Sequence, residues 1–455
     1  MSEQVLGDPS RPATRAVQHI PGEAGLPWFG VLFELLRDQR GMVQRLQAQY
    51  GSVYRVRGLG QWSVYLMGAD ALKMVLLDRE KNFSSAQGWD LSIGRLFRRG
   101  LMLLDFDEHR FHRRLMQAAF RRQALEHYLD DMQRVTRESV ARWHDDPNFH
   151  GYRAIKQLTL DIAAVSFLGI ELGDEADALN QAFIDTVAAS LAPIRLPIPG
   201  TQFQRGLKGR ALLSDYFRDQ IPARRNSNSG DMFTQLCHAT DDDGNAFSNE
   251  DIINHMIFLL MAAHDTVTSS LTTSLFGLAK HPQWQRRLRD ERQSIDADTL
   301  QYADLEALPQ AGWLFNEALR LWCPVPLIPR RVQRSFTYAG VQIPANTQIT
   351  VSPDSAHYDA TIWSDPERFD PERFSDERAE HKRHPFAFSP YSGGAHKCIG
   401  LHFAQMLAKV ILAEVVTHYE LAVPVDYRLD MQPVPIPKPR DDLPLTLSAR
   451  LNLAH

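Results

Sequence analysis

One cysteine segment constrains this chain more than any other feature. The stretch YSGGAHKCIG runs from Tyr391 to Gly400, and an apolar helical pattern continues from about Ile399 to about His418. Cys398 is therefore expected near a helix N-terminus, where unpaired N–H groups and the helix dipole stabilise a thiolate. The neighbouring glycines leave room for a flat, bulky group against the backbone. This pattern favours a metal-binding thiolate.

Other interpretations of this cysteine stay open from the residues alone. A lone cysteine is usually a buried structural residue. A zinc site needs three or four ligands, and the chain has no C-x-x-C partner. A nucleophile needs a base, and His396 is close in sequence without a fixed geometry. The only other cysteines, Cys237 and Cys323, lie far from Cys398. This count excludes a disulfide framework and suits a reducing cytoplasm.

The remaining chain predicts a mainly α fold with small β-sheets, continuous over residues 1–455 as a single domain. Nearly every segment between residues 69 and 295 has helical periodicity, apart from a few loops, one of them near residues 83–99. The longest helix is expected over Ser248–Lys280, with SNED as its N-terminal cap. Strand pairs are expected at residues 52–68, at residues 334–351 and as a final hairpin at the C-terminal end. Residues 1–20 are expected to be a poorly ordered tail.

Charge and hydropathy exclude several classes of protein. The net charge of −5 argues against a general nucleic-acid binder. The first 20 residues contain no apolar core of a signal peptide. The longest apolar stretch, near Ile252–Ala263, is too short to span a bilayer. We therefore expect a cytoplasmic protein that binds neither nucleic acid nor membranes, from a prokaryotic source.

The cysteine segment resembles the haem-binding signature of the cytochrome P-450 family of haem-thiolate monooxygenases, soluble bacterial type. The matching residues are Tyr391, Gly394, His396, Cys398 and Gly400. The resemblance implies haem b with Cys398 as its axial thiolate, held between the long central helix and the loop that carries the cysteine. The family usually has Phe where this chain has Tyr391, so the phenol could tune the iron or point to water.

The family also carries a Glu-x-x-Arg motif on a helix upstream of the cysteine. Of three copies, Glu317–Arg320 fits best because its helix precedes Pro324 and a strand. The other two, Glu34–Arg37 and Glu380–Arg383, are interpreted as solvated pairs. The resemblance adds Arg373 from FDPERF, and implies that Glu317, Arg320 and Arg373 form a structural cluster that holds the cysteine loop.

The long helix carries AAHDTV where the family has an acid–alcohol pair in a kinked helix. The resemblance implies that Asp265 and Thr266 relay protons to dioxygen at the haem. Two residues depart from the pattern: Ala263 replaces Gly, and Val267 replaces Thr or Ser. The sequence does not decide whether the intervening His264 faces the redox side or the substrate.

Haem propionates need cations, and the family places them at positions that this chain matches. His109 and Arg113 are spaced i,i+4 on one helical face. Arg330 fits the arginine expected on the strand after the Glu-x-x-Arg helix, with Arg331 as an alternative. His396 supplies a further contact.

The resemblance finally implies O₂, an apolar small-molecule substrate and a separate electron donor, either a ferredoxin with its reductase or a flavodoxin. The substrate could be a terpenoid, a steroid, a retinoid-like molecule or a fatty acid. The protein is expected to be a monomer. The basic residues proposed to contact the donor are Lys397, His402, Arg121, Arg122, Lys382 and Arg383. Alternatives are a haem-thiolate peroxygenase or isomerase, which Asp265 and Thr266 count against, and a non-catalytic haem sensor or carrier.

Overall fold

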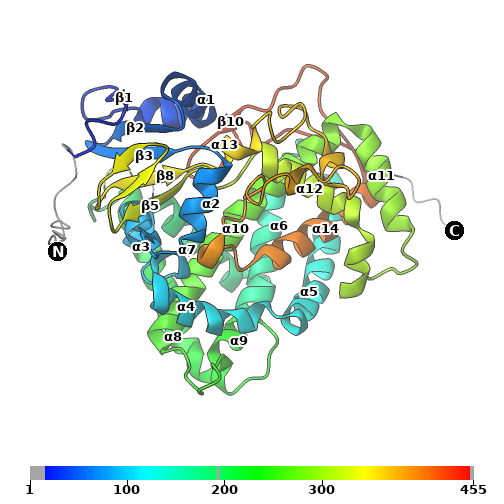
Figure 1. Ribbon diagram of the computed structural model, residues 1–455. Helices are drawn as coiled ribbons and strands as arrows, with labels where there is room; N and C mark the ends of the chain where they lie inside the picture. Colours follow the sequence, from blue (N-terminus) through cyan, green and yellow to red (C-terminus); the bar gives the residue numbers. More distant parts are fainter. Residues whose placement is uncertain (1–15, 191, 193–194, 451–455) are drawn as a thin grey trace.

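The computed structural model describes residues 16–190, 192 and 195–450. Helices make up most of it, and the strands of the main sheet gather on one side, together with the N-terminal helix (Figure 1). The predicted fold class, mainly α with small sheets, is confirmed. Among the described residues, no helix is both long enough and apolar enough to cross a bilayer.

The elements follow one another along the chain with few long gaps. The α-helices are α1 (Leu32–Tyr50), α2 (Ala69–Leu77), α3 (Ser85–Trp89), α4 (Phe106–Met116), α5 (Arg122–Val140), α6 (Gly151–Ala163), α7 (Asp174–Ala189), α8 (Gln202–Arg225), α9 (Met232–His238), α10 (Asn249–Lys280), α11 (Pro282–Gln293), α12 (Pro309–Leu321), α13 (Asp354–His357) and α14 (Leu401–His418). The strands are β1 (Gly22–Glu23), β2 (Val53–Gly58), β3 (Gln61–Leu66), β4 (Phe83–Ser84), β5 (Ile328–Val332), β6 (Phe336–Tyr338), β7 (Val341–Ile343), β8 (Gln348–Val351), β9 (Tyr419–Ala422), β10 (Met431–Gln432), β11 (Lys438–Pro439) and β12 (Thr446–Ala449).

The main sheet has the strand order β1-β2-β3-β8-β5-β4. The predicted hairpin over residues 52–68 is β2–β3, and that over residues 334–351 contains β6–β7. The predicted final hairpin is confirmed in part: β10 and β11 in the Pro-rich end pair antiparallel, but the strand in LPLTLSARL has another partner. Strand β12 pairs with β9, with Ala449 opposite Tyr419, because β9 leaves the end of α14 and offers the chain terminus a free edge.

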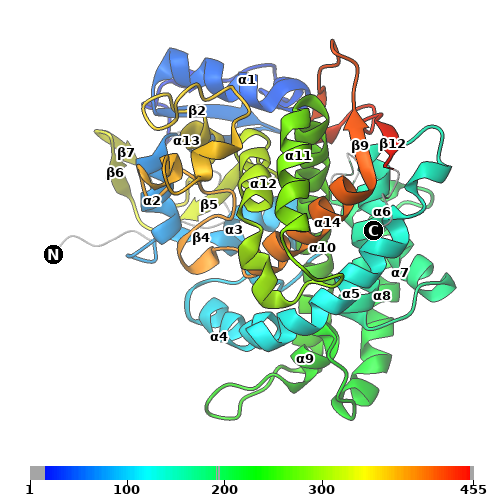
Figure 2. The same ribbon diagram turned by 90° about the vertical axis from the view of Figure 1, so that its right-hand side faces the viewer.

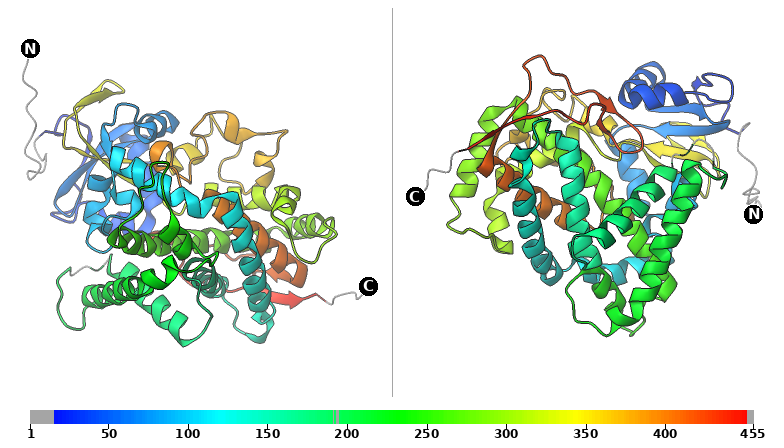
Figure 3. Two further views of the ribbon diagram at one scale, coloured as in Figure 1. Left: turned by 90° about the horizontal axis from the view of Figure 1, so that it is seen from below. Right: turned by 180° about the vertical axis from the view of Figure 1, so that it is seen from behind.

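Helix α10 runs through the middle of the helical part (Figures 2 and 3). Its predicted cap is confirmed: the Ser248 hydroxyl accepts a hydrogen bond from the Asp251 N–H. Most of the helix is buried, and it packs against α6, α8, α12 and α14. A helix that is apolar on nearly all sides is expected in the centre of a large core.

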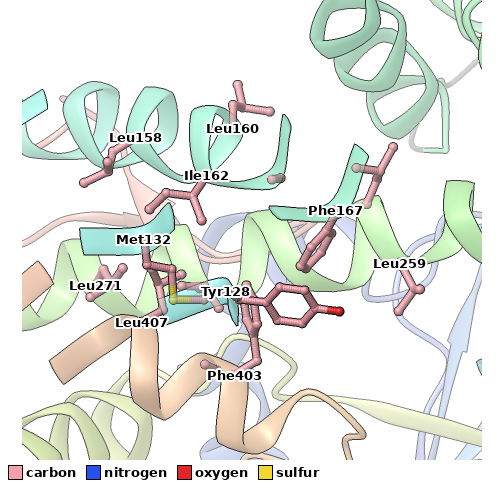
Figure 4. Close-up of a cluster of buried hydrophobic side chains, with 14 of the residues drawn as sticks. Tyr128, Met132, Leu158, Leu160, Ile162, Phe167, Leu259, Leu271, Phe403 and Leu407 are labelled. Carbon is pink, nitrogen blue, oxygen red and sulfur yellow. The ribbon is translucent and has the colours of Figure 1, made fainter. Parts of the chain in front are cut away.

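The largest apolar cluster joins α10 to its neighbours around the cysteine helix. Tyr128 and Met132 from α5 lie against Phe403 and Leu407 from α14 (Figure 4). Side chains from α6 and α10 close the same cluster from the other side. Burial of each large apolar side chain contributes about 1.5–3 kcal/mol, so this packing fixes the position of α14.

Two local predictions need correction. Val17 and Ile20 lie in the expected tail, yet each is only 1% exposed and packs on the apolar side chains of the strand region. The remaining tail positions, residues 1–15, lie outside the described residues. The loop expected near residues 83–99 begins with β4 and the short helix α3, which Ser84 caps by accepting a bond from the Gln87 N–H.

Candidate active site

The cysteine loop is closed by its own backbone. The Cys398 N–H donates to the Tyr391 carbonyl over 2.9 Å, and helix α14 begins three residues after the cysteine. Burial raises the pKa of the Cys398 thiol, while the Gly400 N–H, Arg113 and Lys397 act in the opposite direction. The side chain is nevertheless exposed. The thiol is therefore accessible as a ligand although protein groups surround it.

The two glycines of the signature, Gly394 and Gly400, have different local surroundings, so different contacts explain them. Gly394 has φ +59°, and a Cβ there would lie 2.0 Å from the Leu76 carbonyl oxygen. This glycine is therefore required by the turn and by its contact with α2, which differs from the reason expected from sequence. Gly400 has ordinary backbone angles, and its nearest neighbour would be a Phe120 ring carbon at 3.6 Å. A Cβ at Gly400 would thus meet only ordinary packing contact.

Four groups that can carry positive charge meet beside the cysteine. His109 and Arg113 come from α4, Arg330 from β5 and His396 from the cysteine loop. The two imidazole rings lie 3.9 Å apart, centroid to centroid. Burial lowers the pKa of His109 to about 4 and that of His396 to about 2, with the neighbouring arginines as further causes. Burial also lowers the pKa of Arg330 to about 10.

This cluster has no close ion pair among the described residues: Asp105 and Asp78 oppose the effect of burial and raise the pKa of Arg330, but neither carboxylate lies within 4.0 Å of it. Within the described ranges, no carboxylate lies within 4.0 Å of the side chains of Arg113 or Arg330, and His109 Nε2 is buried without a hydrogen bond. Arg331 points to the other face of β5 and donates to the Asn346 carbonyl over 3.0 Å. Buried cations are normally paired. The residues present therefore fit haem b, whose propionates would supply the missing charge and whose iron would face Cys398.

The Glu-x-x-Arg pair lies where sequence placed it, on α12. Glu317, Arg320 and Arg373 are fully buried. Two hydrogen bonds join Arg320 to Glu317, over 2.7 and 2.9 Å, and Arg373 Nε donates to Glu317 Oε1 over 3.2 Å. Burial raises the pKa of Glu317, and Arg320 opposes this rise. The structure thus brings together the three residues predicted to form this cluster.

Sequence reasoning missed two members of the cluster. Glu380 was interpreted as solvated, but it is 1% exposed and lies 3.2 Å from Arg373 Nη1. His357 joins the cluster to the cysteine loop: its Nδ1 donates to the Arg320 carbonyl over 3.1 Å, and its Nε2 accepts from the Ser389 N–H over 3.1 Å. A charged run and a lone histidine carry no sequence signal that separates these roles from surface positions.

On α10, Asp265 and Thr266 lie in regular helix, without the kink expected there. The Thr266 hydroxyl donates to the Ala262 carbonyl over 2.8 Å. The Asp265 side chain is 17% exposed. Burial raises the pKa of Asp265, but His264, Lys156 and Lys438 outweigh it, so the pKa is lowered overall.

The tyrosine of the signature does not reach solvent. Its hydroxyl is buried without a well-aligned hydrogen bond among the described residues. Burial and the neighbouring Cys398 raise the pKa of Tyr391, and Gln405 opposes the rise. Of the two possibilities that sequence left open, the water-facing phenol is therefore excluded.

Comparisons with known proteins agree with this site. The family model for cytochrome P450 matches residues 20–442. A curated relative named "Putative cytochrome P450 136", from Mycobacterium tuberculosis, is 42% identical over 98% of this chain and 92% of its own length. "Cytochrome P450 26A1" from Gallus gallus is 28% identical over 93% of this chain and 89% of its own length.

A solved structure shows the same architecture. It is described as retinoic acid bound cyanobacterial CYP120A1, and it superposes with a TM-score of 0.85 at 26% sequence identity. The match covers 95% of this chain and 99% of that one. Together with the family match over nearly the whole sequence, this shows that the chain belongs to the cytochrome P450 family.

Proposed function

We propose that the protein is a haem-thiolate monooxygenase that inserts one oxygen atom from O₂ into a large apolar molecule of retinoid-like size and shape. The observation that carries the proposal is the Cys398 thiol beside Arg113, Arg330, His109 and His396, none of which has a carboxylate within 4.0 Å among the described residues. Bound haem supplies the redox chemistry of O₂ activation, and a thiolate ligand favours O–O cleavage.

The cationic groups bind and orient the cofactor. Arg113 and Arg330 pair with the propionates, and His109 and His396 donate hydrogen bonds to the same groups. Arginine suits this task because its planar fork matches a carboxylate. The cluster of Glu317, Arg320 and Arg373 holds the cysteine loop in place and takes no part in the reaction.

Proton handling belongs to α10. Asp265 holds and releases a proton at its carboxylate, and Thr266 passes it on through its hydroxyl. The Thr266 hydroxyl donates to the Ala262 carbonyl, so its oxygen can accept a hydrogen bond from the acid side, and it passes a proton on when the bond to Ala262 is released. The Asp265 side chain is partly exposed, so solvent can resupply the proton.

The substrate class rests on one support. The structural relative is described as bound to retinoic acid, and it matches nearly the whole chain. Among the four substrate classes considered from sequence, this description favours the retinoid-like one over terpenoids, steroids and fatty acids.

The electrons come from a separate ferredoxin with its reductase, or from a flavodoxin. Six exposed basic residues near the cysteine loop were predicted to receive this partner. Lys397, His402 and Arg121 have no carboxylate within 4.0 Å in the described part of the chain. Arg122, Lys382 and Arg383 pair with Glu126, Asp376 and Glu380. We propose that the unpaired three carry the docking, and that the protein acts as a cytoplasmic, single-domain monomer.

Turnover tests the proposal. The haem-loaded protein is supplied with a surrogate ferredoxin, its reductase, NADPH and all-trans-retinoic acid. Substrate-dependent NADPH oxidation with an oxygenated retinoid product supports the proposal. A spin-state shift and reduction without any product would favour the sensor or carrier. Product that forms from hydrogen peroxide, but never from O₂ and reductase, would favour the peroxygenase.

A further inference from the structure

His264 is a buried imidazole that the proposed reaction does not use. It is 2% exposed, lies on α10 next to Asp265, and its Nδ1 is 3.0 Å from Asp265 Oδ1. The Nδ1 has no well-aligned hydrogen bond among the described residues, so the two groups lie at ion-pair distance and a small side-chain rotation would align them. His264 therefore contacts the residue assigned to proton handling and has almost no exposed surface.

The other ring nitrogen fixes where the imidazole can hold a proton. Nε2 lies 3.3 Å from the Lys156 carbonyl oxygen on α6. A carbonyl can only accept, so Nε2 keeps its hydrogen in every protonation state. Neutral His264 therefore presents a lone pair at Nδ1 to the carboxylate oxygen. Two acceptors at this distance repel, so the pair is stable only when one proton lies on either Nδ1 or the carboxyl group.

The groups packed around this pair decide where the proton rests. Lys156 on α6 and Lys438 on β11 both lower the pKa of Asp265, and Tyr152 is the remaining polar neighbour, with Lys438 Nζ 5.1 Å from its ring centroid. The Phe183 ring from α7 packs edge-on against the imidazole at 5.6 Å. These surroundings favour the carboxylate form of Asp265, which leaves Nδ1 of the imidazole as the atom of this pair that can carry the shared proton.

We propose that His264 is a proton store for Asp265, a positioning residue that acts only through that carboxylate. This inference rests on the proposed monooxygenase function. The N–H bond at His264 Nδ1 breaks as an O–H bond forms at the Asp265 carboxylate, and that O–H bond then breaks as the proton leaves for the active site. His264 becomes neutral, and no electron changes place. Solvent reprotonates the pair through the partly exposed Asp265 side chain, because the Nε2 side ends at a carbonyl.

The test uses His264→Asn in the haem-loaded protein. The Asn amide can still donate a hydrogen bond to Asp265, but it cannot store a proton. The matched control is His255→Asn, which replaces another buried histidine of the same helix that contacts His112. Should His264→Asn fail to fold, His264→Gln takes its place.

The first measurement needs no turnover. Infrared difference spectra against Asp265→Asn isolate the carboxyl band of Asp265 and its titration with pH. The account expects the pKa of Asp265 to rise in His264→Asn and to stay at the wild-type value in His255→Asn, because His264 is one of the groups that lower it. An unchanged Asp265 titration in His264→Asn would overturn the proposal.

The second measurement is coupling, the product formed per NADPH consumed. We expect coupling to fall roughly threefold to tenfold in His264→Asn, with a larger solvent deuterium isotope effect, since loss of a proton donor slows proton transfer. If His264→Asn keeps the wild-type coupling, the proposal that His264 stores a proton for Asp265 is wrong. Absence of product from the wild-type protein would instead contradict the proposed function, and the infrared result would still decide the inference.

Discussion

At the residue scale, the most consequential group outside the cofactor site is Glu317. Its carboxylate accepts hydrogen bonds from two fully buried arginines and from the Asp370 N–H. Loss of one partner from a buried ionic cluster leaves uncompensated charge. We expect Glu317→Gln to lower the free energy of unfolding by about 3–5 kcal/mol, measured by urea denaturation.

The matched control is Glu34→Gln. Glu34 belongs to another Glu-x-x-Arg copy, but its carboxylate pairs with Arg45 at the surface. A surface pair contributes roughly 0–1 kcal/mol. Equal losses in the two variants would contradict the structural role assigned to Glu317.

The second prediction at this scale concerns the buried carboxyl group of Asp354 and the pH dependence of stability. Burial raises its pKa from 3.8 to about 7, with Arg40 as the opposing influence. The folded protein therefore keeps a proton that the unfolded chain has already lost. Stability due to this group falls as pH rises from about 4 to about 7, and is constant above that range.

Asp354→Asn removes this dependence. We expect the Tm of the variant, relative to wild type, to increase from about pH 5 to about pH 7 and then to level off. Asp376→Asn, at a fully exposed carboxylate, serves as the control. A Tm difference that stays constant over this range would show that Asp354 does not titrate as proposed.

The site residues that could be predicted from sequence are those that belong to a spaced motif, and burial of a single charged residue could not be predicted. Cys398, His109, Arg113, Arg330 and His396 were found because each belongs to a spaced motif, and the structure brings them together. Glu380 was misjudged because its partner Arg373, only seven residues earlier, is itself buried by its pairing with Glu317 from α12. Local charge patterns do not contain that information.

At the scale of elements, a histidine pair joins α4, the helix that carries His109 and Arg113, to the central helix α10. His112 on α4 and His255 on α10 are both buried, and their ring nitrogens lie 2.7 Å apart. Burial lowers the pKa of both, to about 3 for His255, so the bond joins neutral rings at ordinary pH.

A double-mutant cycle tests this connection. We expect His112→Phe and His255→Phe each to cost about 1–3 kcal/mol, because each leaves a buried nitrogen without a partner. The double variant should cost less than the sum of the two, with a coupling energy above about 0.5 kcal/mol. Additive losses would show that the two helices are held by packing alone.

Elements with a strong local pattern were predicted well from sequence. Helix α10 has the predicted bounds because a capped, apolar segment of that length can form few structures other than a buried helix. The β9–β12 pairing was not predicted, since it joins strands with elements between them and leaves no local signal. The regular helix at Asp265 and Thr266 replaces the expected kink, and Ala263 in place of Gly fits this difference because Ala favours helix.

At the scale of the whole molecule, the proposed electron donor docks on the surface around Lys397 and Arg121. Lys397 and Arg121 are exposed beside the cysteine loop and have no carboxylate partner among the described residues. We expect Lys397→Glu and Arg121→Glu to raise the KM for an acidic ferredoxin several-fold and to weaken its dependence on salt, with little change in substrate binding.

The control is Lys208→Glu, an exposed lysine on α8. It changes the net charge by the same amount on a different element. If all three variants change the KM for ferredoxin equally, overall charge and not this surface governs the encounter.

The central claim is that Cys398 binds haem iron through its thiolate, and the absorption spectrum of the reduced, CO-bound protein tests it most directly. The account predicts a thiolate-type spectrum for the wild-type protein and the loss of this spectrum in Cys398→Ala. The control Cys237→Ala, which changes a buried cysteine elsewhere in the chain, should keep the spectrum. A thiolate-type spectrum that persists in Cys398→Ala would contradict the account.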